Sequence, residues 1–150
     1  MRTQPPSTDE MLRLDNQLCF AVYSASLAMT KLYKPLLDKL HLTYPQYLVM
    51  LVLWERDGLM VSELGERLSL DSGTLTPLLK RLEASGLVAR IRDVDDERRV
   101  RVTLTAAGRK LKARAAGVPG CLMAAAQCSV PELIALTQQI QTLRDRVKAA

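Results

Sequence analysis

The chain of 150 residues is poor in several features that would point to particular classes of protein. It has a single histidine, His41, and three cysteines whose spacing fits no zinc site, so we expect no metal and no cofactor. An odd number of cysteines also argues against a framework of structural disulfides. No apolar run approaches the roughly 18 residues of a membrane span, and the N-terminus lacks the apolar core of a signal peptide. These absences favour a cytoplasmic protein without a membrane partner.

The composition that remains is typical of one globular domain. Hydrophobic residues make up 48% of the chain, which is enough for a core and argues against disorder. The formal net charge is +5. A positive excess suits a nucleic-acid partner, although many other proteins share it.

The stretch from 61 to 86 predicts two short helices joined by a tight turn. Ser62 is in position to cap the first helix, and Asp71-Ser72-Gly73 forms the turn. The second helix, expected from Thr74 to Ser85, has four leucines that should face the core: Leu75, Leu78, Leu79 and Leu82. Its opposite face carries small and basic residues: Gly73, Thr74, Pro77, Lys80 and Arg81, with Thr76 on the flank.

A β-hairpin is predicted directly after these helices. Residues 87–93 and 100–105 alternate apolar and polar, and the segment between them is charged. Helix, turn, helix and hairpin is the order of a winged helix-turn-helix, whose second helix enters a major groove of DNA. Charged faces of this kind also occur as ordinary solvated surface, so the pattern by itself leaves both interpretations open. The expected DNA interface consists of Ser72, Thr74, Thr76, Pro77, Lys80, Arg81, Asp96, Arg98 and Arg99.

The segments on either side of this motif predict long amphipathic helices. From Thr8, apolar residues recur at spacings of three and four, although Pro35 should kink the helix or begin a new segment. A second line on the same helix includes Cys19 and Tyr23, and a helix with two faces withheld from solvent usually packs against two bodies. A terminal amphipathic helix, capped by Ser129, completes the core or associates with another chain.

Two stretches resemble the MarR family of transcriptional regulators. DERRVRVTLT (96–105) is similar to the family's wing motif, and LDSGTLTPLLKRLEASGLV (70–88) is similar to its recognition-helix region. The resemblance implies a homodimer on double-stranded operator DNA. It also implies a mainly α fold with a small β-hairpin wing, a winged helix-turn-helix with an interlocked helical dimerisation region. The chain is then one domain over 1–150, in which 8–44 and 106–150 are dimerisation helices and 45–105 form the winged helix-turn-helix.

Three stretches resemble, more specifically, the organic hydroperoxide resistance regulators of that family: LDNQLCFAVYSASLAMTKLYKPLLDKL, LTYPQYLVMLVLWE and LDSGTLTPLLKRLE. This resemblance implies a reactive Cys19 whose sulfur accepts hydrogen bonds from two tyrosines of the partner chain, Tyr33 and Tyr44. Tyr23 occupies a further tyrosine position of the pattern. The chemistry agrees, because a thiolate attacks a peroxide and phenol O–H groups stabilise a thiolate. Without the resemblance, a buried and inert cysteine would be the ordinary interpretation.

The resemblance also implies a fate for oxidised Cys19. Some members of the subfamily resolve the sulfenic acid with a cysteine in the C-terminal region of the other subunit, and others use a small external thiol. We expect Cys121 to be the resolving cysteine, because the glycines and proline of 117–120 give its segment freedom to move. Cys128 is the alternative.

We therefore expect a redox-sensing repressor, not an enzyme, that binds operator DNA as a reduced dimer. An organic hydroperoxide, as the oxidant, would release it by oxidising Cys19. Two other interpretations stay open: a MarR-type repressor released by a non-covalent phenolic ligand, and a thiol peroxidase that uses Cys19. The peroxidase interpretation leaves the winged helix unexplained.

Overall fold

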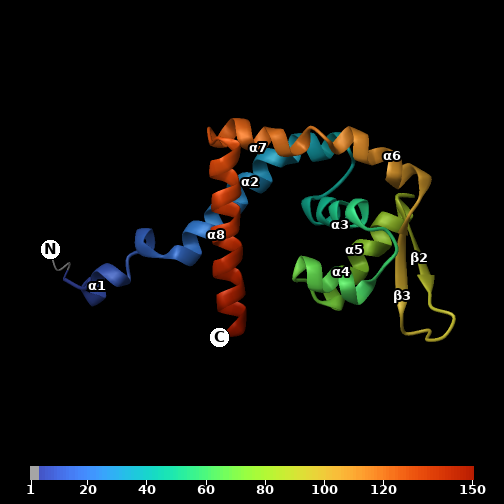
Figure 1. The fold of residues 1–150 in the computed structure, drawn as a ribbon, viewed down its shortest axis with the longest axis horizontal. Helices are drawn as coiled ribbons and strands as arrows, with labels where there is room; N and C mark the ends of the chain where they lie inside the picture. The colour runs from blue at the N-terminus through green and yellow to red at the C-terminus, as the bar shows by residue number, and fades with distance from the viewer. Residues whose placement is uncertain (1–3) are drawn as a thin grey trace.

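The computed structural model describes residues 4–150 and is mostly helical, with one small sheet (Figure 1). A short 3-10 helix, Leu14–Asn16, lies between the first two helices. The strands are β1 Leu59–Met60, β2 Val88–Arg92 and β3 Val100–Leu104. The helices are α1 Thr8–Met11, α2 Leu18–Lys39, α3 Tyr44–Glu55, α4 Val61–Leu68, α5 Ser72–Ala84, α6 Ala106–Ala115, α7 Val118–Ala126 and α8 Val130–Ala149.

The predicted hairpin is present, and the sheet has one strand more. β2 and β3 pair antiparallel, with Val88 opposite Leu104. β1 pairs with the other edge of β3, so the strand order is β1-β3-β2. Because β1 follows α3 closely in the chain, this pairing attaches the base of the wing to the end of α3.

One hydrophobic core lies among α3, α4, α5 and the sheet. Val49, Met50 and Leu53 of α3 are almost fully buried, as its apolar sequence predicts. The four leucines of α5 that were expected to face the core are all buried. The same core extends to the end of α2 and to α6 and the start of α7, through Leu37, Leu40, Leu111, Ala115 and Val118. We name residues 37–118 the winged body.

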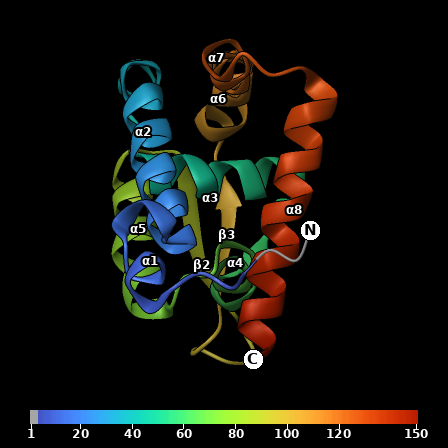
Figure 2. The ribbon, with the colours of Figure 1, turned by 90° about the vertical axis from the view of Figure 1, so that its left-hand side faces the viewer.

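The rest of the described chain, 4–36 and 119–150, has no buried residue, although Tyr33 and Leu36 pack against the edge of the core, and we name it the helical arm. α7 runs along α2 (Figure 1), whereas Figure 2 shows α8 and α2 lying apart. α8 has no buried residue, and α2 has only Leu37. The apolar stripes predicted for these helices are therefore present, but one chain leaves them uncovered.

No single helix within 4–150 is long and apolar enough to span a membrane. The stretch 106–126 and α8 meet that test only when taken together, by length and composition, and they are bent by 95° at their junction.

The predicted continuous helix from Thr8 is wrong. α1 ends at Met11, where the side-chain amides of Asn16 and Gln17 donate to the carbonyls of Glu10 and Met11 at 2.6 and 2.7 Å. These bonds satisfy carbonyl groups that a helix end leaves free, so the break is stable although apolar spacing continues across it. α2 then continues through Pro35, which does not begin a new segment.

The predicted cap at Ser62 is also wrong. α4 begins at Val61, and the Glu63 carboxylate accepts the Met60 N–H at 3.1 Å. Asp71 caps α5, which starts at Ser72, and the predicted cap of α8 at Ser129 is confirmed.

Candidate DNA interface and cysteine site

The inner face of α5 packs into the core, and its outer face is open to solvent. Asp71 Oδ1 accepts the Thr74 N–H at 2.7 Å and holds the start of the helix. This hydrogen bonding lowers the pKa of Asp71, so the cap is ionised at neutral pH. Thr76 is half-buried, and the other predicted DNA-binding residues of α5 are exposed: Ser72, Thr74, Pro77, Lys80 and Arg81.

The wing tip is organised by Asp96. Its Oδ1 accepts the backbone N–H of Arg98 at 3.0 Å and lies 3.3 Å from Nε of the same arginine. Its carbonyl accepts the Arg99 N–H at 2.9 Å. The Arg98 side chain is 93% exposed, so this ion pair is screened by water and contributes little stability. Asp96 therefore orients Arg98 and leaves its side chain exposed, where a binding partner can contact it.

The wing and α5 are held as one unit by residues that the sequence did not single out. Arg90 of β2 forms an ion pair with Glu83 of α5 at 3.1 Å, and these bonds lower the pKa of Glu83. At the base of the wing, Asp57 Oδ1 accepts the N–H groups of Gly58 and Leu104, each at 2.8 Å. The position of the wing relative to α5 is thus fixed within one chain.

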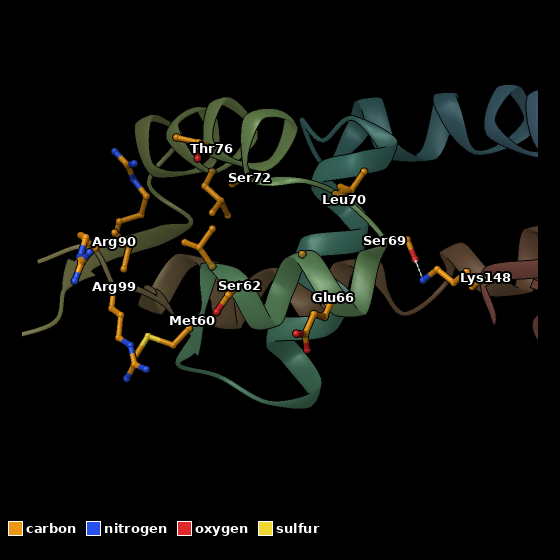
Figure 3. Close-up of a pocket in the computed structure, with 15 residues that line it drawn as sticks. Met60, Ser62, Glu66, Ser69, Leu70, Ser72, Thr76, Arg90, Arg99 and Lys148 are labelled. Carbon is orange, nitrogen blue, oxygen red and sulfur yellow. Dashed lines mark hydrogen bonds between the residues drawn. The ribbon is translucent and has the colours of Figure 1, made fainter. Parts of the chain in front are cut away.

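A groove of about 700 Å³ lies between α4, α5 and the wing (Figure 3). Four predicted DNA-binding residues line it: Ser72, Thr76, Arg98 and Arg99. Residues that the sequence reasoning missed also line it, among them Ser62, Glu66, Arg90 and Lys148. The remaining predicted residues are outside this lining: Thr74, Pro77, Lys80, Arg81 and Asp96. An exposed second helix beside a wing and a groove with several cations is the arrangement of a winged helix-turn-helix DNA-binding regulator.

Cys19 lies far from the tyrosines that the resemblance assigned to it. It is exposed in the first turn of α2, as is Tyr23 one turn further on. Tyr33 follows Cys19 by 14 residues on the same helix, which places it about 21 Å away at a rise of 1.5 Å per residue. One chain therefore does not bring Cys19 to Tyr33, and all three cysteines are free.

The tyrosines themselves form a cluster where the arm meets the winged body. Tyr33 and Tyr44 stack with ring centroids 5.9 Å apart, and Tyr47 packs against them at 6.5 and 6.3 Å. Burial raises the pKa of Tyr33, and charges on Tyr44, Tyr47 and Cys121 raise it further. The raised pKa keeps the Tyr33 phenol protonated, and so able to donate a hydrogen bond, at neutral pH. Tyr47 was missed, although its spacing of three residues from Tyr44 on α3 indicates a shared face.

The two C-terminal cysteines differ in their surroundings. Cys121 is half-buried on α7, which packs along α2, and it is near enough to Tyr33 to raise the pKa of that phenol. Cys128 lies just after α7, where its sulfur is 3.3 Å from the Ala126 carbonyl oxygen. Among residues 4–150, no group of three or more His, Cys, Asp or Glu side chains is placed to hold a metal ion.

Comparison with known proteins agrees with this class. Residues 31–115 match the family described as transcriptional regulator SarA/Rot. The chain is 51% identical, over 132 residues, to the organic hydroperoxide resistance transcriptional regulator of Bacillus subtilis, covering 88% of this chain and 90% of that protein. It is 52% identical, over 141 residues, to the regulator TtmR of Methylorubrum extorquens, covering 94% of this chain and 72% of that protein.

Solved structures give the same result. Reduced AbfR bound to DNA has a TM-score of 0.75 and 38% identity, covering 91% of this chain and 96% of that chain. AbfR, a Staphylococcus epidermidis protein, is less similar when its disulfide is formed, with a TM-score of 0.62, 37% identity and 94% of each chain covered. Our chain belongs to the MarR family of transcriptional regulators, among its organic hydroperoxide resistance regulators. The predicted family and fold class are confirmed, and the relatives are regulators, not enzymes.

Proposed function

We propose that this protein is a homodimeric repressor that binds operator DNA when reduced and leaves it when an organic hydroperoxide oxidises Cys19. The observation that supports the proposal is that the expected parts of the thiol site lie apart within one chain. Cys19 is at one end of α2, and Tyr33, Tyr44 and Cys121 are gathered at the other. The uncovered apolar faces of the arm support a second copy, whose tyrosines would meet Cys19. Such a regulator acts on the chromosome, so we assign it to the cytoplasm.

In the proposed reaction, the Cys19 thiolate attacks one oxygen of the hydroperoxide. The O–O bond breaks, the organic half leaves as an alkoxide that takes a proton, and Cys19 becomes a sulfenic acid. The partner's Cys121 then attacks the Cys19 sulfur, water is released and an intersubunit disulfide forms. Phenol donors from Tyr33 and Tyr44 favour the initial thiolate by hydrogen bonding to its charged form.

Release from DNA would follow from movement of the arm. The winged body has its own core and its own ties between wing and α5, so it moves as a unit. A disulfide at the arm changes how two such units are spaced, and two recognition helices fit successive major grooves only near one helical turn apart, about 34–36 Å. The described conformation is more similar to reduced, DNA-bound AbfR, with a TM-score of 0.75, than to disulfide-formed AbfR, with 0.62, as the proposal expects of the state that binds DNA.

A second candidate, release by a non-covalent phenolic ligand, is favoured by a groove of about 490 Å³ between α2 and α3. Lys31 and Tyr44 line it as donors that suit an acidic phenol, and Lys34 lines it in an ion pair with Asp38. In this case Cys19 would be dispensable for release.

One experiment separates the candidates. A duplex selected from a random-sequence library by the reduced wild-type protein serves as the operator, and binding is measured with and without cumene hydroperoxide. We expect the wild type and Cys128→Ser to leave the duplex and Cys19→Ser to stay bound. Cys121→Ser should lose the intersubunit disulfide on a non-reducing gel. Release of Cys19→Ser by the peroxide would contradict the redox proposal. Release of both wild type and Cys19→Ser by salicylate alone would favour the ligand candidate.

A further inference from the structure

The last turn of α8 brings a positive charge to the turn between α4 and α5. Lys148 Nζ donates to Ser69 Oγ at 3.0 Å, across 79 residues of sequence. Ser69 ends α4 in the left-handed conformation, with φ 55°, and stands two residues before the Asp71 cap of α5. Lys148 forms no ion pair with a carboxylate of residues 4–150. Its charge is therefore held in place by a hydroxyl that does not neutralise it.

This lysine is part of the groove beside the recognition helix. Figure 3 shows Arg90 and Arg99 at one end of the groove and Lys148 with Ser69 at the other. Arg98 also lines the groove, and further hydroxyls in its lining belong to Ser62, Ser72 and Thr76.

The charges in this lining are unbalanced. Glu66 is the one carboxylate among the lining residues, against four cations. Arg90 is offset by its ion pair with Glu83, and Arg98 by its screened pair with Asp96, whereas Arg99 and Lys148 have no such partner among the described residues. Cations and hydroxyls are the side-chain donors that contact the sugar-phosphate backbone in protein–DNA complexes.

We propose that Lys148 contacts a DNA phosphate, so that the DNA interface extends from the wing, along the groove, to the end of α8. Ser69 orients the lysine. A polyanionic duplex is favoured over an acidic protein because the groove is continuous with the exposed face of α5, which carries the predicted recognition residues. The arm, which the sequence analysis assigned to dimerisation alone, then contributes directly to DNA affinity.

The test measures binding to the selected duplex as a function of salt, using only reduced protein, so its outcome is independent of the peroxide proposal. Each phosphate neutralised by a cation contributes about 0.9 to the slope of log K against log salt. We expect Lys148→Gln to lower the slope of the dimer by about 1.8, since two lysines are lost. Lys148→Arg should keep the wild-type slope, and Ser69→Ala should lower it by a smaller amount.

The matched control is Lys112→Gln, which removes the same charge from α6, on the side of the winged body opposite the wing tip (Figure 1). This variant should keep the wild-type slope. Equal slopes for Lys148→Gln and Lys112→Gln would overturn the proposal. Weaker binding by Lys148→Gln with an unchanged slope would also overturn it, because that result assigns Lys148 a purely structural role. Sedimentation of each variant checks that the dimer is intact.

Discussion

The winged body and the helical arm both carry apolar residues at helical spacing, but only the winged body covers them. Leu75 and Leu79 of the body are fully buried, whereas Leu18 and Leu136 of the arm are 61% and 49% exposed. A periodic stripe therefore identifies a helix without identifying what packs on it. The difference teaches that one chain covers the apolar residues of the body, whereas it leaves those of the arm open to solvent.

The largest effect is expected from deleting a body leucine. Leu79→Ala should lower the free energy of unfolding by about 2–5 kcal/mol, because it leaves a cavity in a packed core. Urea denaturation at several protein concentrations measures it, and the loss should be the same at each. The matched arm variant, Leu136→Ala, should cost less, and its deficit should disappear on dilution as dimers dissociate. A deficit for Leu136→Ala that persists at high dilution would contradict the division into body and arm.

A smaller effect is expected where arm and body meet. In the dimer, Tyr44→Phe should slow the alkylation of Cys19 by iodoacetamide at neutral pH by about tenfold, because a hydrogen bond to a charged group is worth about 1.5–3 kcal/mol and its loss leaves less thiolate. The alkylation rate measures this, in a chain that carries Cys121→Ser and Cys128→Ser. Tyr47→Phe is the control, because it removes a hydroxyl from the same cluster and should leave the rate unchanged. Equal losses of rate would mean that the cluster acts by packing alone.

The smallest effect is expected at the exposed cap of α5. Asp71→Ala should slightly lower the midpoint of thermal unfolding at pH 7. Folding lowers the pKa of Asp71, so its contribution is present above the unfolded pKa, near 3.9, and is lost as pH falls through the folded value. The difference between wild type and Asp71→Ala should therefore vanish in acid. Asp95→Ala, which removes an exposed wing carboxylate, should show no such pH-dependent loss.

The sequence predicts most of the winged body because its signals are local. The four leucines of α5, the cap at the start of that helix and the alternation of the hairpin all act within a few residues. The break after Met11 was missed, because it depends on two side-chain amides and no glycine or proline marks it. β1 was missed as a strand, since two residues are too short to show alternation.

The candidate sites divide in the same way. The α5 and wing residues were found from a motif, and Cys19 from a resemblance. Lys148 was missed because its partner, Ser69, is 79 residues away in sequence, and Arg90 because its partner, Glu83, lies in a different element, α5. No local pattern identifies such a contact. It can be found only once the fold shows that the end of α8 lies beside the end of α4.

The distance of about 21 Å between Cys19 and Tyr33 on one straight helix has a genetic consequence under the proposed function. A chain with Cys19→Ser still supplies tyrosines, and a chain with Tyr44→Phe still supplies the thiol. When both chains are made in one cell, the mixed dimer contains one site with both the Cys19 thiol and the Tyr44 hydroxyl. Its other site lacks both groups. Two alleles that each fail to sense peroxide alone would then complement each other, whereas two alleles that both lack the thiol would not.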